Sequence, residues 1–373
     1  GSALRDTIYA PEARRMAVTE YMLPGTTMSF VWAPERPGTW LLHCHLTFHV
    51  GPNPGFGADS LTLEQAEHRL RHPHDGEDAN HHVEKGMGGL MVSIEVPTPR
   101  GWRLPTAVRR RVRFEIPGDS APGARVPSFA PTIEADGRRT PELQSGGPGA
   151  TLFLYQNEPT AIRVVNRANE PTAIHWHGME LESLYDGVVG LGGTPGRRAR
   201  AVDPRDSVEV LMTPPRAGTF IYHTHLMEIR QLSGGLYGPM IVLPPGTAWD
   251  PVHDHVFIVG STRGEGLRMN GARRLPALEF RSGSVHRLRL INISSGTPQL
   301  RYFLVRGDST LTEWTALAKD GMDLPPGQQR TTPSFQSVSM GETYDFRFEA
   351  REPGEYRLEA RAGLVNVVAT QPI

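Results

Sequence analysis

The residue types best suited to holding a metal are concentrated in one short stretch, WLLHCHLTFH at 40–49. Successive side chains of an extended strand point to opposite faces, so His43 and His45 would share one face and Cys44 would occupy the other. Two imidazoles can then serve one metal site while the thiolate between them serves a second. His49 follows Cys44 by five residues, which is close enough for its imidazole to reach the metal bound by the sulfur.

A methionine completes the set around the sulfur. Cysteine and histidines with a weak axial methionine are the ligands of a blue-copper electron-transfer site. Met87, in KGMGGLMVSIEV, is the axial candidate because it lies where the chain enters a predicted strand. Cys44 is the only cysteine of the chain and cannot form an internal disulfide. The alternative reading is a buried free thiol among core histidines.

Two further pairs of histidines have the same i, i+2 spacing. IHWH at 174–177 supplies His175 and His177, and YHTH at 222–225 supplies His223 and His225. One such pair alone would indicate packing or surface. The phrases APERPGTWLLHCH and TPPRAGTFIYHTH, however, match each other before two of the three pairs, which indicates two related β-domains with equivalent edges. Imidazole suits several metals, and the thiolate selects copper.

Three of these phrases, HCHLTFH, IHWHG and YHTH, resemble three of the four copper-binding motifs of multicopper oxidases such as laccases. The likeness covers essentially the whole chain, including EPTAIHWHGMELESLYDGV, RLRLINIS and GETYDFRFEA. It implies cupredoxin-like domains, a type 1 copper that takes electrons from a reducing substrate, and a trinuclear cluster that reduces dioxygen to water.

The resemblance also implies a role for each candidate residue. Cys44 and His49 match type 1 copper ligands, with Met87 axial, and His175 matches a type 2 ligand. Ligands of the paired type 3 coppers are matched by His43, His45, His177, His223 and His225. Asp186, nine residues beyond His177, matches the acidic residue that delivers protons to reduced oxygen, as a carboxylate near the cluster could. Its alternative reading is a turn former before Gly187.

Two features depart from the family pattern. The fourth motif, HPxHxHG, occurs nowhere in the sequence, and the HCH phrase precedes the HWHG phrase. We therefore expect the chain to be the later part of a longer protein, or a fragment of one. An insertion between His49 and Met87 carries five histidines: His68, His72, His74, His81 and His82. His82 competes with His49 for the type 1 copper, and we favour His49 for its distance from the cysteine.

Short β-rich runs bounded by Gly, Pro, Asp and Asn must position these residues; examples are TMSFVWAP, RVRFEI, AIRVVN and YDFRFEA. They predict an all-β fold of tandem cupredoxin-like Greek-key β-sandwich domains. Breaks near 100 and 250 divide the chain into an incomplete domain at 1–99, a domain with the HWHG and HTH motifs at 100–249, and a third at 250–373 without copper ligands. One helix is predicted at 60–72, and His253, His255 and His286 are interpreted as structural.

Charge and hydropathy exclude several classes of function. Lys+Arg 39 against Asp+Glu 40 gives no support for a nucleic-acid partner, and no stretch approaches the roughly 20 apolar residues of a membrane helix. The expected partners are a phenolic or metal-ion electron donor and dioxygen. A periplasmic or extracellular location follows from the resemblance alone. Neither the donor nor the oligomeric state is specified by these motifs.

Two other functions compete with the oxidase. A copper-binding or electron-transfer module without oxidase activity is the main alternative, because the missing motif would leave the cluster open. A copper nitrite reductase ranks lower, since it needs no pairing of HWHG with HTH. An HPxHxHG phrase shortly upstream in the coding sequence would favour the oxidase.

Overall fold

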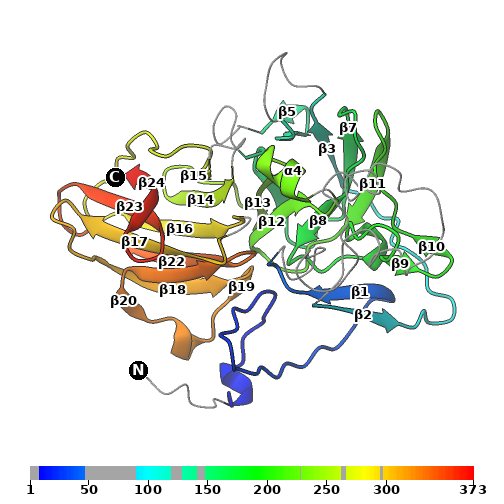
Figure 1. Ribbon diagram of the computed structural model, residues 1–373, viewed down its shortest axis with the longest axis horizontal. Coiled ribbons are helices and arrows are strands. Elements are labelled where there is room, and N and C mark those ends of the chain that lie inside the picture. Colours follow the sequence, from blue (N-terminus) through cyan, green and yellow to red (C-terminus); the bar gives the residue numbers. More distant parts are fainter. Residues whose placement is uncertain are drawn as a thin grey trace, which may run out of the picture.

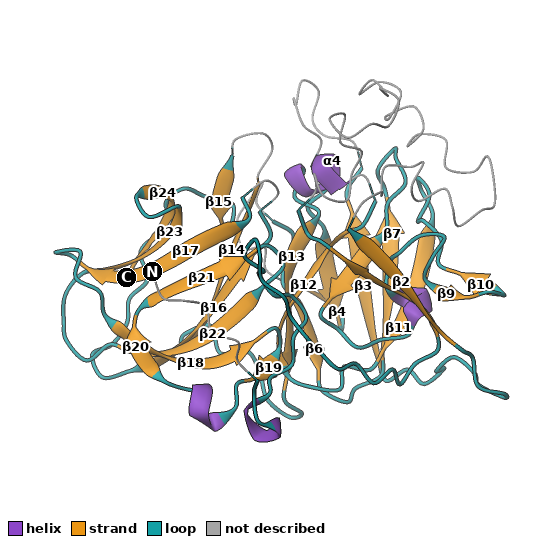
Figure 2. Cartoon of the chain, turned by 60° about the horizontal axis from the view of Figure 1, so that its bottom comes forward, coloured by secondary structure: helices purple, strands orange, loops and turns teal. Residues whose placement is uncertain are grey.

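The computed structural model describes residues 8–46, 90–118, 128–140, 148–226, 228–261, 266–294 and 297–373. This part of the chain is built mainly from strands, so the prediction of an all-β protein is confirmed (Figure 2). Its helical elements are the short α4 (Glu228–Ser233) and the 3-10 turns η1 (Pro11–Ala13), η2 (Ser183–Tyr185) and η3 (Pro326–Gln328). None of these could cross a membrane. The helix predicted at 60–72 lies outside the described residues.

The HCH phrase begins at the last residue of β1, a strand of a four-stranded sheet with the order β10-β9-β1-β2. Its strands are β1 (Gly38–His43), β2 (Met91–Val96), β9 (Gly193–Thr194) and β10 (Arg197–Arg198). β1 and β2 are antiparallel over their whole length, with His43 opposite Met91. β9 pairs with β1 at Thr39, so the middle of the chain completes the sheet that carries the first histidines.

One strand predicted from its apolar content is absent. The run TMSFVWAP at 27–34 is an extended segment that no described strand pairs with. Phe30 is 53% exposed and Val31 is 89% exposed. A strand is stabilised by a partner strand and a buried face, and this segment has neither among the described residues. The strand prediction for it is therefore wrong.

Residues 110–243 form a β-sandwich of two sheets around one core. The first sheet, in the order β11-β7-β3-β4-β5, consists of β3 (Arg110–Ile116), β4 (Thr132–Ala135), β5 (Arg138–Arg139), β7 (Thr160–Asn166) and β11 (Ser207–Met212). The second, in the order β6-β13-β12-β8, consists of β6 (Leu152–Tyr155), β8 (Ile174–His177), β12 (Gly218–Thr224) and β13 (Tyr237–Leu243). Phe114 from the first sheet packs edge-to-face against Trp176 and Tyr222 from the second, all fully buried.

Residues 254–372 form a second sandwich beside the first (Figure 1). One sheet contains β14 (Asp254–Ser261), β15 (Leu267–Met269), β16 (Val285–Asn292), β18 (Glu313–Lys319), β19 (Met322–Asp323), β20 (Thr331–Pro333) and β22 (Thr343–Glu349). The other contains β17 (Gln299–Arg306), β21 (Phe335–Ser339), β23 (Tyr356–Ala362) and β24 (Asn366–Pro372). Trp314 and Phe346 stack in their shared core. We retain the domain division near 100 and 250 as a proposal.

Candidate metal centre

Six imidazoles gather where β1, β8 and β12 end close to one another. Neighbouring ring centroids lie between 4.9 and 6.3 Å apart. The set consists of His43, His45, His175, His177, His223 and His225. His43 lies 5.5 Å from His225, and His45 lies 4.9 Å from His177, so the HCH phrase meets both other phrases. The structure thus brings the pair His43 and His45 together with two pairs that lie 130 or more residues further along the sequence.

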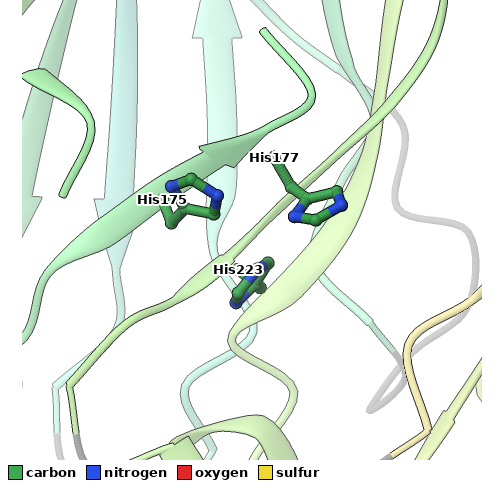
Figure 3. A group of neighbouring side chains, drawn as sticks. All are labelled: His175, His177 and His223. Carbon is green, nitrogen blue, oxygen red and sulfur yellow. The ribbon is translucent and has the colours of Figure 1, made fainter. Parts of the chain in front are cut away.

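Strand geometry explains the arrangement within the sandwich. β12 and β8 are antiparallel with His223 directly opposite His175 and Tyr222 opposite Trp176. Because side chains alternate along a strand, the two aromatic rings enter the sandwich core and the flanking imidazoles face the opposite way. One possible ligand atom each from His175, His177 and His223 lies within 4.8 Å of the others (Figure 3). This spacing suits ligands that share a metal site.

Hydrogen bonds select which ring nitrogen is available as a ligand. Backbone carbonyls lie 2.7–3.0 Å from Nδ1 of four rings, namely His43, His45, His175 and His223. A carbonyl only accepts, so Nδ1 carries the proton and Nε2 keeps its lone pair. In His177 the roles of the two ring nitrogens are exchanged, because its Nε2 lies 3.1 Å from Thr19 Oγ1. Its Nδ1 is then the nitrogen left for a ligand bond.

Burial keeps five of the six imidazoles neutral. Burial, and next the neighbouring His45, lowers the pKa of His43 to about 4. Burial likewise lowers the pKa of His177, His223 and His225 well below the usual value, and other histidines of the cluster add to the effect. The pKa of His45 is also lowered, mainly by burial. A neutral imidazole is the form that binds a metal, so at pH 7 protons compete weakly for these nitrogens.

Asp186 lies directly against the cluster. Its backbone carbonyl accepts from His175 Nδ1 at 2.7 Å, and its Oδ1 lies 3.2 Å from the same nitrogen. Gly187 permits this approach, because it has φ +83° and a Cβ there would lie 2.2 Å from the Ile174 carbonyl oxygen. The loop after η2 can therefore pack its backbone onto β8. Asp186 thus both precedes the turn at Gly187 and lies beside the histidine cluster.

Comparison with known proteins agrees with this geometry. Residues 134–247, which contain four of the six histidines, match the family model described as multicopper oxidase. This stretch of the chain is therefore similar to a multicopper oxidase domain. It is 32% identical over 127 residues to copper resistance protein A of Escherichia coli, covering 33% of this chain and 20% of that protein. It is 27% identical over 258 residues to laccase-2 of Botryotinia fuckeliana, covering 59% of this chain and 41% of that protein.

Solved multicopper oxidases share the fold. The crystal structure of the blue copper oxidase from Nitrosomonas europaea matches with a TM-score of 0.52 and 20% identity, over 70% of this chain and 84% of that chain. A variant of the laccase from B. aclada also matches with a TM-score of 0.52, at 22% identity, over 72% of this chain and 53% of that chain. The chain spans only about a fifth to two fifths of the curated relatives named above.

Copper fits the donors that residues 134–247 and the HCH phrase bring together. Neutral imidazoles are ligands that copper prefers, and in four of the six rings Nδ1 is already held by a backbone carbonyl, as is usual around a metal. Cys44 lies between His43 and His45, and its N–H donates to the Leu90 carbonyl at 3.0 Å. His49, Met87 and the competing His82 lie outside the described residues, so the full type 1 set is a proposal.

The sequence did not reveal the outer partners of two histidines. His45 Nδ1 donates to the carbonyl of Met340, and His177 contacts Thr19. A backbone carbonyl is present at every residue and leaves no trace in the sequence. Thr19 stands in an extended segment outside every copper motif. The histidines interpreted as structural, His253, His255 and His286, lie together near the starts of β14 and β16.

Proposed function

We propose that this chain forms part of a laccase-like copper oxidoreductase. It would oxidise a phenolic or metal-ion donor at a type 1 copper and reduce dioxygen to water at a trinuclear cluster. The convergence of six imidazoles, five of which burial keeps neutral, carries this proposal. Packing alone gives no reason to bury six imidazoles together, because burial costs polar groups their hydrogen bonds to water. A periplasmic or extracellular location belongs to the same proposal.

Each residue of the cluster has a proposed role as a ligand of one type of copper. His175 would bind the type 2 copper, and the type 3 pair would be held by His43, His45, His177, His223 and His225. Copper, when bound, supplies one-electron transfer and reduction of dioxygen. Cys44 would hold the type 1 ion with His49 and Met87. Because Cys44 is peptide-bonded to both His43 and His45, a short covalent path joins the electron-entry site to the cluster.

Asp186 is the proposed proton donor, and its replacement tests that role. Asp186→Asn keeps the backbone carbonyl that accepts from His175, so bound copper should stay unchanged. Loss of the acidic group should slow oxygen uptake by about 10²-fold, the lower end of general acid catalysis. Oxygen uptake and copper content are measured on the same sample. Asp206→Asn, at an exposed ion pair with Arg200, is the matched control. If Asp186→Asn leaves oxygen uptake unchanged, Asp186 is not the proton donor and acts only as a turn former.

Copper binding tests the proposal as a whole. His223→Ala should lower the copper bound per chain and abolish oxygen uptake with a phenolic donor, because it removes a ligand directly opposite His175. His253→Ala changes a histidine outside the cluster and should alter neither quantity. Metal analysis and an oxygen electrode supply the two readings. If the unaltered protein takes up no more copper than His223→Ala, the cluster is not a copper site.

A second candidate is a copper-binding electron-transfer module without oxidase activity. A cysteine and histidines such as Cys44 and His49, which are ligands of electron-transfer copper sites, favour it. The two functions separate in one measurement. Copper uptake with a blue colour but without oxygen consumption indicates the electron-transfer module, whereas consumption of oxygen with a donor indicates the oxidase.

A further inference from the structure

The last sandwich supplies no proposed copper ligand, yet it contacts the histidine cluster directly. The carbonyl of Met340 accepts from His45 Nδ1 at 2.9 Å. The adjacent Gly341 has φ +86°, and a Cβ there would lie 2.3 Å from the same nitrogen. The turn between β21 and β22 therefore packs its bare backbone against the His45 ring. This segment is part of the wall of the cluster.

A second contact reaches the cluster through Thr19, which belongs to the extended segment before β1. Thr19 Oγ1 lies 3.1 Å from His177 Nε2. If Nε2–H donates to the hydroxyl, Nδ1 keeps its lone pair and faces the other imidazoles. If the hydroxyl donates instead, Nδ1 carries the proton and the ring has no lone pair left for a metal. The contact therefore bears on whether His177 can act as a ligand.

The backbone of Thr19 is held on both sides by the last sandwich. Its N–H donates to Asp320 Oδ2 at 3.2 Å, and its carbonyl accepts from Lys319 Nζ at 2.5 Å. Asp320 is itself fixed, because its Oδ1 accepts from the Thr343 N–H at 3.0 Å. Asp320 and Gly321 form the tight turn between β18 and β19, with φ of 49° and 71°. Thr19 thus rests on a rigid hairpin end.

Charges that are seldom buried surround this contact. Lys319 is 1% exposed, and its ammonium lies 2.8 Å from Glu20 Oε1, 3.2 Å from Glu342 Oε1 and 3.4 Å from Asp320 Oδ2. Burial opposes its charge, but Asp320 and Glu342 outweigh burial and raise the pKa of Lys319. Glu20 also pairs with Arg15 at 2.7 Å. Burying such ions is costly unless each is partnered, so the network holds Thr19 and Glu20 in one position.

We propose that Thr19 is a positioning residue for the cluster, placed by Asp320 and Lys319 so that His177 presents a free ring nitrogen. The role of the last sandwich is then to hold the first segment, which carries His43 and His45, against the ligands of β8 and β12. This inference rests on the proposed copper site. Outer partners of metal-binding histidines are typically worth about 10–100-fold in metal affinity.

The test compares three variants of the whole chain. Thr19→Val keeps the volume and the backbone contacts but removes the hydroxyl, and Thr19→Ser restores it. Thr26→Val is the matched control, because the Thr26 hydroxyl donates to the nearby Leu23 carbonyl in the same segment and to no other described residue. Copper retained against increasing chelator is measured for each. The thermal unfolding midpoint of the metal-free proteins is measured alongside.

Thr19→Val should lose copper at about 10–100-fold lower chelator activity, while Thr19→Ser and Thr26→Val match the unaltered chain. The metal-free midpoints should stay equal. Equal copper retention in Thr19→Val would overturn the positioning role. So would a loss that Thr19→Ser fails to restore, or one that merely follows a lower unfolding midpoint. If the unaltered chain itself binds no copper, the proposed copper site fails instead, which is a distinguishable result.

Discussion

Replacing Cys44 with serine should abolish the intense blue absorption of the copper-loaded protein. A thiolate bound to copper(II) absorbs strongly in the visible range, whereas copper held by imidazoles alone does not. Cys44 is the only cysteine of the chain, so no other sulfur of this type can replace it. Serine is nearly isosteric, and the Cys44 side chain is only partly buried. The sheets should therefore remain folded, with an unchanged far-ultraviolet circular dichroism spectrum.

The same visible spectrum can identify which histidine binds copper together with the Cys44 sulfur. His49→Ala should remove or shift the blue band, while His82→Ala should leave it in place. The reverse result would assign the ligand to His82. Copper content should fall by one ion in Cys44→Ser and stay unchanged in a surface control such as His253→Ala. A copper-loaded protein with Cys44 intact but without a blue band would refute the electron-entry role, and the oxidase proposal with it.

The Asp345→Ala variant should lower the free energy of unfolding by about 3–5 kcal/mol, the usual cost of breaking a buried ion pair. Asp345 is 1% exposed and lies at the contact between the two sandwiches. Its carboxylate accepts from Thr219 Oγ1 at 2.8 Å, from Arg289 Nη1 at 3.1 Å and from Arg287 Nε at 3.0 Å. Arg289 is 5% exposed and would keep only Asp254 as its charged partner.

This loss can be measured by urea unfolding followed through tryptophan fluorescence. Arg347→Ala is the matched control on the same strand, because its ion pair with Glu349 is exposed and should be worth less than about 0.5 kcal/mol. Thr219 lies on β12, which also carries His223, so weaker copper retention is expected together with the lower stability. Equal stability of the two variants would mean that the sandwiches are held together mainly by apolar contact.

The sequence alone determines which residues can act together within one strand. The i, i+2 spacing places His175 and His177 on one face, and Trp176 between them must enter the core. The same alternation separates Cys44 from its neighbouring imidazoles. These predictions depend only on the geometry of an extended chain, which every strand shares. The matching phrases that contain β1 and β12 likewise indicated two related β-domains, which stays a prediction.

The tertiary structure decided which of these faces meet. His45 reaches Met340, and Thr19 reaches His177 and Asp320, across 158 to 301 residues of chain. Such contacts depend on how sheets pack, and a carbonyl or a threonine has no sequence signature as an outer partner. Lys319 would be placed on the surface from its residue type, because a lone ammonium is costly to bury. Its burial became favourable only once three carboxylates from separate parts of the chain surrounded it.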